Sequence, residues 1–155
     1  MGEPVLNQLF SAVSHFSLAK SADAQSEVLA QLVDSVAAPN SKFRVIGEGF
    51  HLSADLEGTS AIKKFLRNTL VPAYYNNVDV AQAPAVSDPP EVIGNPSAPD
   101  ASFAIVFHGE LVAKSGKPWV NDAVLVVKTD SQAKWVDVKL YLDTLQLQNH
   151  INGSA

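Results

Sequence analysis

The last third of the chain contains three long apolar segments that are separated by two short polar turns. The segments cover residues 102–113, 119–128 and 134–142, and the turns cover 114–118 and 129–133. Such short connections join neighbouring antiparallel strands, whereas parallel strands need long crossovers. The pattern therefore predicts an antiparallel meander in the second half of the fold.

Helical periodicity dominates the residues that precede the meander. Apolar side chains recur every three or four positions over 5–16 and again over 28–36, which predicts two helices. Ser21 or Asp23 is expected to cap the second helix, because both side chains can accept a bond from a free amide of the first turn. A third helix is expected to start after residues 58–60, with Thr59 or Ser60 as its cap.

Shorter elements are expected between and after these helices. Residues 42–54 predict one or two strands, 77–81 predict another short strand, and 144–151 predict a closing helix. Pro72 is expected to close or kink the third helix, because proline lacks an amide hydrogen. Five prolines fall within 84–99, so this segment is expected to be a long loop, either a lid or a plain surface insertion.

The order of these elements predicts an α+β fold, with helices packed on one face of a curved antiparallel sheet. The length of 155 residues is that of one domain, so a single domain over 1–155 is expected, with the Pro-rich loop at 84–99. The net charge of −5 and the scattered basic residues argue against a nucleic-acid partner.

Composition also narrows the cellular setting. No apolar run reaches the ~18 residues that a membrane helix needs, and the first residues lack the pattern of a signal peptide. The chain contains no cysteine, which excludes disulfides and thiolate chemistry. A cytoplasmic protein without a membrane partner is therefore expected.

The final strand has two faces of different character. Val136, Val138, Leu140 and Leu142 alternate with Trp135, Asp137, Lys139 and Tyr141. The second set mixes aromatic and charged side chains, which suits either the wall of a pocket or an interface between subunits. Which of the two faces lines a pocket stays open at this point.

Three motifs resemble segments of SnoaL-like proteins. Residues 116–122, Gly-Lys-Pro-Trp-Val-Asn-Asp, resemble the family's Gly-x-Pro-aromatic-x-Asn-Glu entry into a strand, with Asp122 in place of Glu. Residues 138–144, Val-Lys-Leu-Tyr-Leu-Asp-Thr, resemble its closing strand, although the usual acid before the aromatic residue is absent. Residues 58–62, Gly-Thr-Ser-Ala-Ile, resemble its Gly-x-x-x-Ile helix start.

The resemblance implies the nuclear-transport-factor-2-like cone fold, which ketosteroid isomerase and scytalone dehydratase share. It implies a deep, mostly apolar pocket that the sheet wraps and the helices close, and a homodimer formed through the outer face of the sheet. Family members perform acid–base chemistry on small carbocyclic or polyketide-like molecules, and others serve as binding or assembly modules, so the fold alone does not assign an activity.

Acid–base chemistry of this kind needs a base and a hydrogen-bond donor for a developing oxyanion. The candidate catalytic residues are Asp137, His51, Asp122 and His108. Asp137 is flanked by Trp135 and Lys139 on one strand face, so it is either a base with a shifted pKa or half of a surface or interface ion pair. The two histidines are either bases or partly buried structural residues.

A second set of residues is expected to contact a substrate. It consists of Trp119, Asn121, Trp135, Tyr141, Tyr74 and Phe50. Asn121 and Asp122 are adjacent on a strand, so only one of them can face a given pocket. Tyr74 either donates to an oxyanion at the mouth of the cone or packs beneath the Pro-rich loop.

Other chemistries lack the residues they need. The sequence contains no His-x-His or His-x-x-x-His spacing, no Gly-x-Ser-x-Gly motif and no phosphate-binding glycine loop. The sequence thus predicts a cofactor-independent isomerase, cyclase or dehydratase of secondary metabolism, acting on a small apolar, oxygenated, polyketide- or terpenoid-like metabolite. The alternative is a non-catalytic small-molecule-binding or protein-assembly module that uses the same cone.

Overall fold

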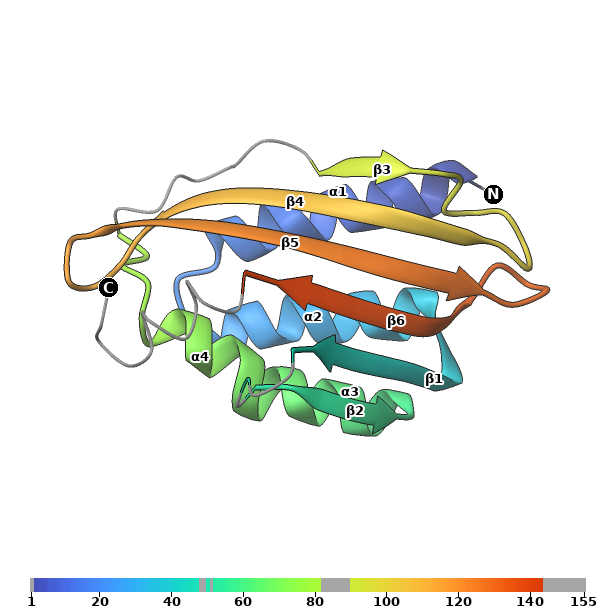
Figure 1. Ribbon diagram of the computed structural model, residues 1–155, viewed down its shortest axis with the longest axis horizontal. Coiled ribbons are helices and arrows are strands. Elements are labelled where there is room, and N and C mark those ends of the chain that lie inside the picture. The colour runs from blue at the N-terminus through green and yellow to red at the C-terminus, as the bar shows by residue number, and fades with distance from the viewer. Residues whose placement is uncertain (1, 48–49, 51, 82–89, 144–155) are drawn as a thin grey trace.

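The computed structural model describes residues 2–47, 50, 52–81 and 90–143 of the chain. Within them, six strands form one mixed sheet in the order β2-β1-β6-β5-β4-β3 (Figure 1). The strands are β1 (Ala37–Ile46), β2 (Ala54–Glu57), β3 (Glu91–Ile93), β4 (Ser102–Val112), β5 (Pro118–Thr129) and β6 (Trp135–Leu142). The predicted α+β architecture is confirmed.

Strands β4, β5 and β6 form the predicted antiparallel meander. The sheet as a whole is not antiparallel, however, because β1 pairs with β6 in parallel. These two strands lie far apart in the sequence and are not joined by a direct crossover, so no local pattern indicated that they pair. Their contact makes β6 a central strand, with β5 on one side and β1 on the other.

The helices lie together on one face of the sheet (Figure 1). They are α1 (Gly2–Leu18), α2 (Ala22–Val36), α3 (Thr59–Phe65), a π-helical turn η1 (Leu66–Leu70) and α4 (Val71–Tyr75). Ser21 is the cap of α2, and its hydroxyl accepts a bond from the amide of Ala24 at 3.1 Å. The side chain of Ser21 thus satisfies one of the free amides of the first turn.

Pro72 does not end the third helix. The preceding turn widens to a π-helix, in which the amide of Val71 donates to the carbonyl of Leu66, and the helix then continues to Tyr75. A π-turn adds one residue to the helical repeat and so rotates the residues that follow. The extra rotation sets the direction of α4, which carries Tyr74 and Tyr75.

The core lies between the helices and the inner face of the sheet. Alternate residues of β4 and β5 are buried on this face, among them Phe103, Ile105, Trp119 and Val127. This burial follows the two-residue period of a strand that has one face covered. No helix among the described residues is long and apolar enough to cross a membrane.

A bulge at the start of β6 changes the expected faces of that strand. Asp137 pairs with Lys128, but Thr129 pairs with Trp135, so Val136 is the extra residue. Trp135 consequently turns to the inner face, where it is 5% exposed and packs edge-on against Phe103 at a ring distance of 5.6 Å. The expectation that Trp135 and Asp137 share a face is therefore corrected.

The remaining short elements differ in part from expectation. Residues 77–81 form no strand, only an isolated bridge between Val78 and Ala113. Within the Pro-rich segment, β3 pairs with β4 at the edge of the sheet, where a neighbouring proline costs no ladder hydrogen bond. The helix expected over 144–151 lies outside the described residues.

Candidate functional site

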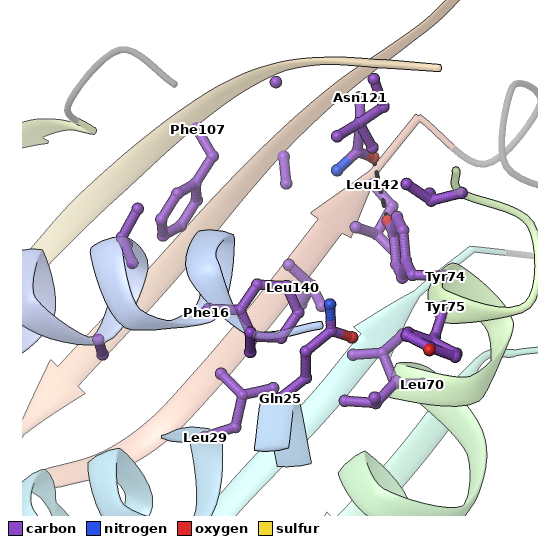
Figure 2. Close-up of a pocket in the computed structure, with 18 of the residues that line it drawn as sticks. Phe16, Gln25, Leu29, Leu70, Tyr74, Tyr75, Phe107, Asn121, Leu140 and Leu142 are labelled. Atoms are coloured by element: carbon purple, nitrogen blue, oxygen red, sulfur yellow. Dashed lines mark hydrogen bonds between the residues drawn. The ribbon is translucent and has the colours of Figure 1, made fainter. Parts of the chain in front are cut away.

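A cavity of about 350 Å³ lies between the helices and the inner face of the sheet (Figure 2). We call it the main cavity. Its walls come from α1, α2, the end of η1, α4 and strands β4, β5 and β6, and most of its lining side chains are apolar. The volume falls within the ~300–1,000 Å³ that is typical of small-molecule pockets.

Tyr74 and Asn121 form the best-defined polar pair of the main cavity (Figure 2). The phenol of Tyr74 donates to Oδ1 of Asn121 at 3.0 Å. The Tyr74 ring stacks on Trp119, with centroids 5.6 Å apart and planes 9° apart, and Trp119 is only 1% exposed. Such stacking restricts the ring to one orientation and adds about 0.5–1.5 kcal/mol beyond burial.

The environment of Tyr74 keeps its phenol protonated. Burial raises the pKa of Tyr74 far above its ordinary value of 10.0, and the charge of Asp143 adds to this effect. The charged phenolate is poorly solvated at this position, so the neutral form persists at all physiological pH values. Tyr74 is therefore a hydrogen-bond donor and not a base.

Gln25 brings a third polar side chain to the main cavity. It extends from α2 into the space between Phe16, Leu70 and Leu140 (Figure 2). Gln25 is 7% exposed, and its Oε1 has no hydrogen-bond partner among the described residues. A buried amide without a partner is uncommon in folded proteins and indicates a place where a ligand or an ordered water is accommodated.

The strand period explains why Asn121 reaches the main cavity. Trp119, Asn121 and Ala123 point to the inner face of β5, whereas Asp122 points outward. Gly109 of β4 lies directly opposite Asn121, and a Cβ there would lie 3.4 Å from the Asn121 carbonyl oxygen. A residue without a side chain thus keeps the inner face open beside the Asn121 amide.

No protein-family model matches the chain, and no curated protein matches it. Solved structures do match. A proposed isomerase from Bacillus subtilis superposes with a TM-score of 0.60 at 17% identity, over 99% of this chain and 95% of its own. TerC, co-crystallised with polyporic acid, superposes with a TM-score of 0.61 at 16% identity, over 96% and 98%. An NTF2-like protein of unknown function from Burkholderia pseudomallei gives 0.58 at 15% identity, over 94% and 97%.

The chain has the nuclear-transport-factor-2-like fold. The sheet forms the wall of the cone, and the helices close its open side (Figure 1). In the expected motif at 116–122, Trp119 and Asn121 are the residues that face the interior of the cone. The Tyr74 ring reaches them from the opposite wall.

Two of the expected catalytic residues lie on the outer face of the cone. His108 and Asp122 pair across β4 and β5, with Nδ1 of His108 2.5 Å from Oδ1 of Asp122. Nε2 of His108 lies 3.7 Å from Glu110, which follows on the same face. The bond to Asp122 raises the pKa of His108 above its ordinary value of 6.5. These three side chains form an exposed ionic cluster on the outer face, although His108 and Glu110, which flank Gly109, are also among the residues that line the main cavity.

Asp137 also lies on the outer face, contrary to the expectation that it acts in the pocket. Its carboxylate accepts two bonds from Nη2 of Arg44, at 3.1 and 3.2 Å. The pair joins β6 to β1 and is partly exposed, so it corresponds to the ion-pair alternative. Tyr141 lies on the same outer face and is 41% exposed, so it does not contact the interior of the cone.

The other expected residues divide between core and cavity. Phe50 is 5% exposed and belongs to the hydrophobic core. Trp135 lines a second cavity of about 180 Å³, which adjoins the first and which we call the side cavity. His51 lies outside the described residues. Within the described residues, no three His, Asp or Glu side chains are placed to hold a metal ion.

Two relevant residues were not among the expected site residues. Gln25 precedes Leu29 by four residues and Leu32 by seven, so it lies on the same helix face as the apolar stripe of α2. This spacing was the sequence feature that could have indicated that Gln25 faces the interior. Asp143 follows Leu142 at the end of β6, and its charge acts on Tyr74. The motif resemblance at 138–144 included Asp143, but its effect on the site arises only because the fold brings its charge near Tyr74 of α4.

Proposed function

We propose that the protein binds a small, largely apolar, oxygenated molecule in the main cavity. The observation that carries this proposal is the apolar main cavity, into which Gln25, Tyr74 and Asn121 point. Apolar walls with a few convergent polar groups are typical of small-molecule sites. TerC, which has the same fold, was co-crystallised with polyporic acid, and this agrees with a ligand of that kind.

The chemistry of the three side chains defines the oxygen functions that would bind. With Tyr74 donating to Oδ1 of Asn121, the Nδ2 group of Asn121 remains a donor, and Gln25 carries both a donor and an acceptor. A carbonyl or hydroxyl group would satisfy these atoms. A carboxylate is less suitable, because no Lys or Arg lines the main cavity among the described residues, and His108, which does, is already paired with Asp122.

Binding can be tested with 2-naphthol and naphthalene, which differ only in one hydroxyl group. We expect 2-naphthol to bind more tightly than naphthalene by about ten-fold, because a matched hydrogen bond to a buried amide contributes ~1–1.5 kcal/mol. Asn121→Leu should remove most of this difference. Equal affinity of the two probes for the native protein would contradict the proposed role of the polar groups.

A matched pair of variants locates the binding. Ala123→Phe places a large ring on the inner face of β5 within the main cavity, whereas Val120→Phe adds the same ring at an exposed outer position of the same strand. We expect Ala123→Phe to abolish binding of 2-naphthol and Val120→Phe to leave it unchanged. Binding that survives in folded Ala123→Phe would place the ligand elsewhere.

A second function, isomerase or cyclase activity on the bound molecule, is supported by one feature of the site. Tyr74 is held as a neutral phenol beside Asn121, which is the property of a donor to a developing enolate oxygen. The structural neighbours described as proposed isomerases agree with this chemistry. Asp143 is near enough for its charge to raise the pKa of Tyr74, but it is not among the residues that line the main cavity.

This second function can be tested before the natural substrate is identified. 2-Tetralone carries exchangeable hydrogens next to its carbonyl, so catalysed proton abstraction in deuterium oxide is visible by NMR as loss of these signals. We expect exchange above the buffer rate, and a decrease of about 10²-fold or more in Tyr74→Phe if the phenol stabilises the enolate. Binding of 2-tetralone without any catalysed exchange would favour the non-catalytic alternative.

We also propose that two copies associate through the outer face of the sheet. Val120 and Tyr141 are each 41% exposed there, Val124 of β5 pairs directly with Tyr141 of β6, and Val126 is the next residue on the same face of β5. An exposed apolar patch of this kind is typical of an interface. Sedimentation should show a dimer for the native protein and a monomer for Val124→Asp. A native protein that remains a monomer when its concentration is raised 100-fold would contradict the proposal.

A further inference from the structure

The side cavity lies directly against the main cavity. The two share six lining residues, Leu29, Leu32, Leu70, Phe107, Leu125 and Leu140. The shared wall is formed only by apolar side chains, so no polar group separates the two cavities. A molecule bound in the main cavity can therefore extend into the side cavity across this wall.

The surface of the side cavity is entirely apolar. Polar side-chain atoms occur among its lining residues only in Ser41 and Trp135, and both atoms, Oγ and Nε1, are covered. Neither has a hydrogen-bond partner among the described residues. Ser41 is 1% exposed, and its backbone carbonyl accepts a bond from Gly58 at 2.8 Å, which fixes its position beside the start of α3.

An apolar surface determines what this space can hold. A buried water needs two to four polar partners, and a cavity of about 150 Å³ lined by Leu, Ile and Phe stays dry and accepts benzene. The side cavity, at about 180 Å³, is of comparable size. Three aromatic side chains, Phe43, Phe107 and Trp135, contribute to its wall, and aromatic pairs favour edge-on or offset contacts with a further ring.

We propose that the side cavity is a dry subsite for an unsubstituted, benzene-sized aryl group. This inference rests on the proposed function, because it concerns the same ligand. The ligand then has two unlike ends: an oxygen function at Gln25 and Asn121 in the main cavity, and a hydrocarbon ring at Phe43 and Trp135 in the side cavity. The side cavity thereby selects against molecules that carry polar substituents on the distal ring.

The test uses benzene and phenol as probes of the native protein. In the native protein we expect NMR contacts between benzene and the indole N–H of Trp135. Measured through these Trp135 contacts, phenol should bind at least about ten-fold more weakly than benzene, because its hydroxyl would be buried in the side cavity without a partner. Phenol held by Gln25 and Asn121 in the main cavity would not produce these contacts. Tighter binding of phenol than of benzene by the same contacts would overturn the proposal, since it would mean that Ser41 or Trp135 supplies a polar contact.

Two helix variants separate the two cavities. Val33 lines only the side cavity and Val13 only the main cavity, and both are partly buried. Val33→Phe should weaken benzene binding at least about ten-fold, whereas Val13→Phe should change it less than about two-fold, because each ring fills one cavity. The reverse result would overturn the proposal.

If Val33→Phe does not fold, the NMR contacts between benzene and the Trp135 indole in the native protein provide the test of the side cavity. Absence of any contact between benzene and Trp135 at saturating benzene would then overturn the proposal. The proposed function fails separately, if 2-naphthol shows no dependence on Ala123→Phe while benzene still contacts Trp135.

Discussion

The bond between Tyr74 and Asn121 allows a quantitative test of how the main cavity is built. Tyr74→Phe keeps the ring that stacks on Trp119 but removes the hydroxyl that donates to Oδ1 of Asn121. A buried hydrogen bond contributes about 0.5–1.5 kcal/mol, and an acceptor left unpaired costs about 1–3 kcal/mol more. Water can enter the cavity and offset part of this cost, so we expect a loss of about 1–2 kcal/mol in the free energy of unfolding.

A double-mutant cycle isolates the bond from the other effects of each substitution. Asn121→Leu removes the acceptor with little change in volume, and the double variant removes both partners. If the bond is present, the double variant should be about 1 kcal/mol more stable than the sum of the single losses predicts, because the second substitution has no bond left to break.

Urea unfolding followed by circular dichroism measures all four proteins, and the near-ultraviolet signal of Trp119 reports whether the stacked ring is retained. Additivity of the two single losses to within about 0.3 kcal/mol would refute the bond. A coupling of the expected size would confirm that the two walls of the cone are joined at this point.

Three further predictions concern residues inside and outside the cavity. Because the folded pKa of Tyr74 is raised above its unfolded value near 10, the free energy of unfolding should be unaffected below pH 10 and should fall as pH rises above it. Absorbance at 295 nm should show that one of the three tyrosines resists ionisation until the protein unfolds, and Tyr74→Phe should abolish both effects. Full ionisation of all three tyrosines at pH 11 in the folded protein would contradict this prediction. Asp137→Ala should lower the free energy of unfolding by no more than about 1 kcal/mol and leave 2-naphthol binding unchanged, because the ion pair with Arg44 is partly exposed and lies on the outer face. A loss of 2-naphthol binding, measured by calorimetry, would show that Asp137 contributes to the binding site. Ser41→Ala should be neutral or stabilise the protein by up to about 1 kcal/mol in urea unfolding, because it removes a buried hydroxyl without a partner, and a clear destabilisation would show that Oγ is bonded.

The sequence predicted the parts of the fold that depend on local periodicity. The spacing of apolar residues located α1, α2 and the meander, and the choice of Ser21 or Asp23 as a cap included the residue that caps α2. The parallel pairing of β1 with β6 could not be predicted in this way, because it joins segments about a hundred residues apart, and register between distant strands depends on tertiary packing.

The candidate site was predicted less completely, and the reason is the direction of strand faces. The two-residue period separates Asn121 from Asp122, but only the position of the helices decides which of the two points into the cone. The extra residue Val136 has no glycine or proline to indicate a bulge, so the inward turn of Trp135 was not foreseen. For the same reason Asp137 was expected beside Trp135 and instead pairs with Arg44.

The most direct test of the central claim is the side-chain amide NMR spectrum of Gln25 and Asn121 during titration with 2-naphthol. These two amides point into the main cavity from opposite walls, so a ligand between them should shift both sets of signals with one common dissociation constant. The backbone amide signals of Arg44 and Asp137, which pair on the outer face and do not line the main cavity, should stay unchanged. Shifts confined to the outer face, with both cavity amides unaffected at saturation, would contradict the account.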